Sequence, residues 1–150
     1  MSPWRRFRRL DDRDRRLLAE AAALVWMAWI GLRLLPFLTI RALLDRYAIR
    51  FIAPRDAIPP PAERAAWAVN AAADRSPVMM TCLVRAVAAD AMLRRHGYAS
   101  ELHIGVRRAG HQSRAALESH AWVECNNRIV IGALDDLADY AIMAPQRQSS

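Results

Sequence analysis

The sequence predicts an α+β fold, in which a helical N-terminal half precedes a cysteine-bearing helix and a small antiparallel sheet. Apolar residues recur at helical spacing through most of the first half of the chain. The same spacing resumes at Cys82, directly after Thr81, a residue type that caps helices, and stops at Gly97. After Gly97 the apolar residues recur at every second position, which is typical of strands with one buried face.

The N-terminal part of the chain predicts two helices. A wide apolar stripe indicates a long helix over residues 11–35, which Pro36 ends or kinks. A second helix is expected over residues 37–46. We therefore expect an N-terminal helical segment, residues 1–53, joined to a catalytic core, residues 54–150, within one compact domain.

The middle of the chain is expected to contain an extended linker over residues 48–62, because four prolines interrupt it. A short amphipathic helix follows over residues 62–74. Ser76-Pro77 then turns the chain into the cysteine helix.

The C-terminal part predicts an antiparallel sheet. Alternating residues indicate a strand over 101–107, a polar loop over 108–118 and a second strand over 120–125. Asn126-Asn127 is a suitable two-residue hairpin turn, since asparagine tolerates positive φ, and residues 128–133 return as the partner strand. The last residues, Gln-Arg-Gln-Ser-Ser, are expected to fray.

The composition excludes several classes of protein. The chain has a formal net charge of +7, with arginines concentrated near the N-terminus among three aspartates, which favours a solvated, salt-bridged helix start. Aromatic residues are not interleaved with these arginines in a recognisable nucleic-acid motif, so we expect no nucleic-acid partner. Peripheral membrane attachment through residues 4–44 is disfavoured by the embedded acidic residues.

The cysteine content and the N-terminus predict a cytoplasmic protein. Cys82 and Cys125 are the only cysteines, no secretory signal accompanies them, and a pair in a chain of this length indicates free thiols in a reducing compartment. The longest uncharged apolar run, residues 21–32, is too short to span a bilayer, so we expect no transmembrane helix.

Cys82 is the candidate nucleophile, because the N-terminus of a helix favours thiolate over thiol. A cysteine nucleophile needs a base, and His120 is the best placed histidine, since the patterned strand after it fixes its position. His103 also lies on an expected strand, whereas His96 is expected to be structural and His111 solvated. From spacing alone, a buried core cysteine is the default reading of any cysteine. That reading fits Cys125, which shares its strand face with two apolar residues.

Motifs in the second half of the chain add to this reading. CLVRAVAADAMLRRHGYASELHIGV (residues 82–106) together with SHAWVE (residues 119–124) resembles the transglutaminase-like proteins of lasso-peptide biosynthesis, in particular their leader peptidases. LRLLPF (residues 32–37) and the helix around Trp67–Asn70 are similar to the same family. This resemblance implies a papain-like core, in which Cys82 is the nucleophile and His120 the general base and acid of a cysteine protease.

The resemblance also implies partners and one departure from the family. A separate small leader-recognition protein would present the precursor peptide, and an ATP-dependent lasso cyclase would close the ring; no metal or organic cofactor is implied.

The family's orienting aspartate aligns with Gly132, which has no side chain. Its place could be taken by Asp135 or Asp136, or by a backbone carbonyl or water, or the site could be a dyad. A simple hairpin register sets Ala133 opposite His120. The alternative function is a non-catalytic scaffold that binds the precursor or the cyclase.

Overall fold

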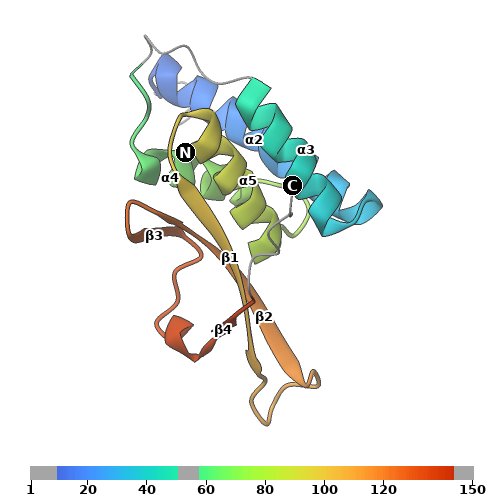
Figure 1. Cartoon of the computed structure of the whole chain (residues 1–150). Coiled ribbons are helices and arrows are strands. Elements are labelled where there is room, and N and C mark those ends of the chain that lie inside the picture. Colours follow the sequence, from blue (N-terminus) through green and yellow to red (C-terminus); the bar gives the residue numbers. More distant parts are fainter. Residues whose placement is uncertain (1–9, 51–57, 144–150) are drawn as a thin grey trace, which may run out of the picture.

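The computed structural model of the chain describes residues 10–50 and 58–143, and it has the expected α+β architecture (Figure 1). The arginines at positions 5–9, most of the proline-rich linker and the last seven residues, all subjects of sequence predictions, lie outside the described residues. The helices are α2 (Asp12–Leu34), α3 (Phe37–Arg50), α4 (Ala62–Asp74) and α5 (Cys82–Arg95). The strands are β1 (Ser100–Arg108), β2 (Leu117–Cys125), β3 (Arg128–Ile131) and β4 (Ala141–Ile142), with a short 3₁₀ helix, η1 (Leu137–Asp139), before β4.

The helices follow the sequence prediction closely, with one correction. α2, α4 and α5 begin and end within one residue of the positions that the apolar pattern predicts. α3 is longer than predicted, because residues 48–50, which we assigned to the linker, continue it to Arg50. Ala48 is 2% exposed, so burial of this residue favours one further helical turn before the prolines.

The sheet has the order β3-β2-β1-β4, and all its pairs are antiparallel. The turn between β2 and β3 has φ of 53° at Asn126 and 60° at Asn127, as expected for a two-residue hairpin of this hand. Our predicted register is confirmed for the two pairs next to the turn, Cys125 with Arg128 and Glu124 with Ile129. It is wrong beyond them, because a bulge between Val123 and Glu124 sets Ile131 opposite Val123. This bulge shifts the end of β3 by one residue along β2.

The segment after β3 contains an element that the sequence did not reveal. β4 adds to the free edge of β1, where Gly105 pairs with Ile142 and Val106 with Ala141. A two-residue strand carries too little alternation to be recognised from sequence. Its presence returns the chain from β3 across the sheet to β1, so that residues 132–142 lie beside the middle of the β1–β2 hairpin (Figure 1).

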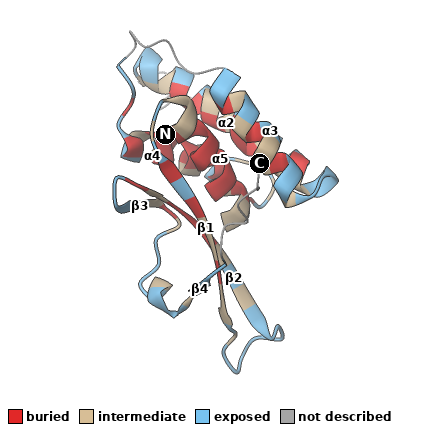
Figure 2. Cartoon of the chain, in the orientation of Figure 1, coloured by how far each residue is buried: buried red, intermediate tan, exposed pale blue. Residues whose placement is uncertain are grey.

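One hydrophobic core joins the helices to one face of the sheet. Figure 2 shows buried residues gathered where α2, α4 and α5 pack together and along the half of the β1–β2 hairpin beside them, whereas the far half of the hairpin is mostly exposed. Alternate residues of β2, namely Ala121, Val123 and Cys125, belong to this core. Since side chains alternate along a strand, His120 and Trp122 lie on the other face of β2.

α2 is, among the described residues, the one helix long and apolar enough to cross a membrane by length and composition. A third of its most apolar window is buried inside the protein. Leu24, Val25 and Ala28 on this helix are at most 1% exposed, which is the burial expected of a core helix.

Candidate functional site

Cys82 is the first residue of α5, as the sequence predicts. The Thr81 hydroxyl caps the helix by accepting a hydrogen bond from the Val84 backbone N–H at 3.4 Å. The Cys82 side chain is half-buried against the hydrophobic core. It therefore lies at the positive end of the helix dipole, beside backbone N–H groups that have no partner within the helix.

Arg85 holds the start of α5 in place, a role that the sequence analysis missed. Its guanidinium donates to the Asn70 side chain at 3.0 Å and to Asp74 at 2.7 Å, both on α4. It also donates to the Met80 carbonyl at 3.4 Å, in the segment that leads into Cys82. Arg85 is the arginine of the Cys-Leu-Val-Arg run with which α5 begins, so the candidate nucleophile and the residue that anchors its backbone lie within four positions of each other. Arg85 is visible in the sequence, but only the fold shows that its partners lie on α4.

His120 lies on β2, directly opposite Gly105 of β1. Its Nε2 is 2.7 Å from the Gly132 backbone carbonyl oxygen. A carbonyl oxygen can only accept a hydrogen bond, so Nε2 must carry the proton. In the neutral ring Nδ1 is then unprotonated, and Nδ1 makes no hydrogen bond to any residue that the structure describes. The imidazole is thus set in the tautomer whose free nitrogen can accept a proton.

The orienting group of His120 is therefore a backbone carbonyl, one of the alternatives that the sequence left open. Asp136, another of those alternatives, bonds to the Arg107 guanidinium instead. This hydrogen bond lowers the pKa of Asp136 below its usual value, and the charges of Arg107 and His120 contribute in the same direction. Asp136 is thus an ionised neighbour of the imidazole, while Asp135 is exposed and pairs with no described residue.

The thiol and the imidazole are not hydrogen-bonded to each other in this structure. Cys82 packs against the helical core, and His120 lies on the strand face that carries Trp122. α5 contacts both β1 and β2. Catalytic hydrogen bonds are often long in ligand-free proteins and tighten when substrate binds. A reactive pair therefore requires that the two groups approach each other on binding.

Of the four remaining candidate residues, three have structural roles and His111 is exposed. His96 is 3.1 Å from the Glu20 carboxylate and links the end of α5 to α2. His103 stacks on Trp122 with ring centroids 5.5 Å apart, and His111 is exposed in the loop after β1. Cys125 is 3% exposed, and burial raises the pKa of its thiol, so it fits the predicted role of a core residue.

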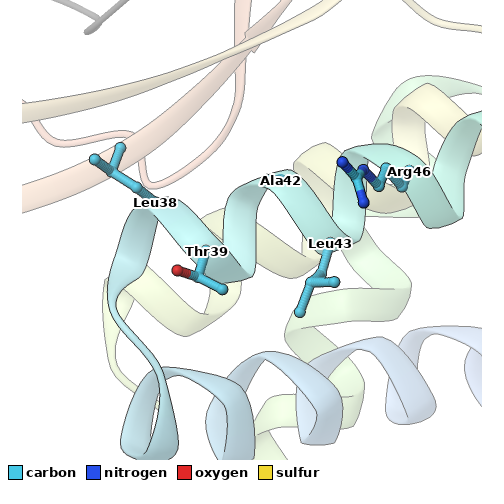
Figure 3. A pocket seen from close by; sticks show the side chains of 5 residues that line it. All are labelled: Leu38, Thr39, Ala42, Leu43 and Arg46. Carbon is cyan, nitrogen blue, oxygen red and sulfur yellow. The ribbon is translucent and has the colours of Figure 1, made fainter. Parts of the chain in front are cut away.

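A surface hollow of about 320 Å³ lies along α3 and is lined by neither Cys82 nor His120. Figure 3 shows the five side chains that line it: Leu38, Thr39, Ala42, Leu43 and Arg46. Within residues 10–50 and 58–143, no group of three or more His, Cys, Asp or Glu side chains is arranged to hold a metal ion.

Comparison with known proteins bears on this geometry. The family model of the transglutaminase-like superfamily matches residues 17–144. This match covers most of α2 and both candidate catalytic residues. Searches of curated proteins and of solved structures found no match.

Proposed function

Since this chain belongs to the transglutaminase-like superfamily, we propose that it is a cysteine peptidase with Cys82 as nucleophile and His120 as general base and acid. The observation that carries the proposal is the hydrogen bond from His120 Nε2 to the Gly132 carbonyl. This bond leaves Nδ1 as the proton acceptor, which is what a base that activates a thiol needs. The position of Cys82 at the start of α5 adds the second requirement, an environment that favours thiolate.

The chemistry follows from these two groups. The Cys82 thiol gives its proton to His120 Nδ1, and the thiolate attacks the carbonyl carbon of a peptide bond. The resulting oxyanion would be stabilised by backbone N–H groups at the start of α5. His120 returns the proton to the leaving amine, and a thioester to Cys82 remains. Water then adds to the thioester while His120 removes its proton, and the acid is released with the free thiol restored.

The proposed substrate is the leader region of a ribosomally made lasso-peptide precursor, and the proposed compartment is the cytoplasm. The support is the run of motifs in residues 82–106 and 119–124 that resembles lasso-peptide leader peptidases. The proposed partners are a small leader-recognition protein, which presents the precursor, and an ATP-dependent lasso cyclase. The hollow on α3, with exposed Leu38 and Leu43 beside Arg46, is an apolar and basic surface suited to docking one of them.

The second candidate function is a non-catalytic scaffold that binds the precursor or the cyclase. Two observations favour it. Cys82 and His120 make no hydrogen bond to each other, and Gly132 stands where the resemblance to leader peptidases implies an aspartate. A scaffold would bind the precursor without cutting it.

Mass spectrometry of the precursor after incubation with this chain and the recognition protein separates these functions. The peptidase proposal expects leader release by the wild type and by Cys125→Ala, and none by Cys82→Ala or His120→Ala. Cys125→Ala is the matched control, because it removes the other thiol. Leader release by Cys82→Ala would end the proposal, and binding without cleavage by the wild type would favour the scaffold.

Alkylation by iodoacetamide tests the thiol without relying on turnover. Preferential modification of Cys82 over Cys125 at neutral pH is expected, because Cys125 is buried with a raised pKa. If His120 approaches Cys82 on binding, the precursor with its recognition protein should change the Cys82 alkylation rate in the wild type. In His120→Ala the same addition should change the rate only through steric protection of the thiol, so the difference between the two rate changes reports His120.

A further inference from the structure

The geometry points to Tyr140 and Gly105 as positioning residues that set the ring orientation of His120, through a clamp formed by the segment after β3. We define the clamp as the rings of Trp122 and Tyr140 together with the Gly132 carbonyl. The inference rests on the proposed function for its catalytic meaning, but the ring orientation itself can be measured without any substrate.

Three contacts from separate parts of the chain surround the imidazole. Trp122, two residues along β2, stacks at 16° to the ring with centroids 6.3 Å apart. Tyr140, just before β4, lies with its centroid 5.9 Å from that of His120 at 49°. The Gly132 carbonyl accepts from Nε2. Together, the two rings restrict rotation of the imidazole, and the carbonyl selects which nitrogen carries the proton.

Gly105 makes room for this arrangement. A Cβ at this position would lie 2.8 Å from the Tyr140 Cβ and 2.9 Å from both Cη2 and Cζ3 of Trp122. Its φ is not in the left-handed region, so the backbone does not require glycine there. The absence of a side chain directly opposite His120 is therefore a packing requirement of the two rings that flank it.

Arg107 ties the clamp to the sheet. Its guanidinium lies 4.6 Å from the Tyr140 ring centroid and bonds to Asp136 and, at 2.9 Å, to Glu118. The Met143 backbone N–H donates to the Ile104 carbonyl at 2.8 Å, just past β4. The chain is thus tied to β1 both before Tyr140, at Asp136, and after it, at Met143. The Tyr140 ring contacts Arg107 and His120, while its hydroxyl makes no hydrogen bond to any described residue. The ring, rather than the hydroxyl, carries the positioning role.

The test compares Tyr140→Ala with Tyr140→Phe, the matched control that keeps the ring. The primary readout is the ¹⁵N NMR spectrum of the His120 imidazole in the whole chain, at a pH where imidazole is ordinarily neutral. The wild type and Tyr140→Phe are expected to give a single Nε2–H tautomer. Tyr140→Ala should give a mixture of both tautomers, and Gly105→Ala should do the same if it folds.

Activity on the precursor gives the second readout. Because positioning affects the proton transfers rather than binding, kcat should fall by about tenfold in Tyr140→Ala with KM unchanged, and stay within about twofold in Tyr140→Phe. An unchanged tautomer in Tyr140→Ala would overturn the inference, whatever its activity. If the tautomer changes as expected but the wild type never cuts the precursor, the proposed function fails and the clamp stands.

Discussion

Gly132→Ala should destabilise the protein more than any other glycine-to-alanine change among the described residues. Gly132 has φ of +78°, and a Cβ there would lie 2.6 Å from the Ala121 carbonyl oxygen and 3.0 Å from the Trp122 Cα. Both neighbours are backbone, so they cannot move aside by a rotamer change. The left-handed conformation costs about 1–2 kcal/mol and the overpacking about 1–3 kcal/mol, or about 2–5 kcal/mol together.

Two other glycines separate these contributions. Gly97 has φ of +85° and nothing within 4 Å of an added Cβ, so Gly97→Ala should cost only the conformational part, about 1–2 kcal/mol. Gly110 has neither feature and should tolerate alanine with little change. Gly132→Asp introduces the same Cβ at the same φ as Gly132→Ala and should be at least as unstable.

Urea unfolding followed by circular dichroism measures the stability of the four variants. With a slope of about 2 kcal/mol per molar urea, the midpoint of Gly132→Ala should lie about 0.5–1.5 M below that of Gly97→Ala. Equal midpoints for these two variants would refute the steric part of the reasoning. A stable and more active Gly132→Asp would show that the backbone here accommodates a side chain, against the geometry given above.

Three further changes test other parts of the structure. Burial raises the pKa of Glu20, but His96 and Arg95 outweigh burial, so the pKa of Glu20 is lowered overall. The ionised Glu20 therefore stabilises the folded protein fully above about pH 4.5, and this stabilisation is lost as pH falls through the lowered pKa. Glu20→Gln should therefore lose less stability than the wild type as the pH is lowered below about 4.5, as measured by acid unfolding. The same pH dependence of stability in both proteins would contradict this. Thr81→Ala removes the cap of α5 and should lower the free energy of unfolding by about 1 kcal/mol in urea titrations, whereas Thr81→Ser should retain most of it. Asn127→Gly should stabilise the β2–β3 turn by up to about 1 kcal/mol, since φ of 60° suits glycine, and a lower melting temperature would count against the turn assignment.

Local sequence signals determined most of the elements. The apolar stripe of α2, the cap at Thr81 and the paired asparagines after β2 each specify a structure through neighbouring residues alone. The helix end at Gly97 is of the same kind, since its φ of +85° requires a residue without a side chain. Such features can be predicted from the sequence because their hydrogen bonds join residues that are only a few positions apart.

Only part of the candidate site could be predicted from local sequence signals. The sequence identified Cys82 and His120 as the chemically interesting residues and left a backbone carbonyl among the possible orienting groups. It did not show that Arg85 ties the start of α5 to α4, because that contact depends on how two helices pack. It also gave the wrong register for the end of β3, since a bulge adds one residue without changing the alternation that can be read from sequence.

The sequence by itself determined the helices and the hairpin, because each follows from residue type and local spacing, and it suggested Cys82 and His120 as the candidate thiol and imidazole. Only the tertiary structure decided that Gly132 bonds His120, that Tyr140 flanks its ring and that Cys82 makes no hydrogen bond to it. Those outcomes depend on residues 12 to 38 positions apart in the chain, and their placement is set by packing and by the pairing of β4 with β1.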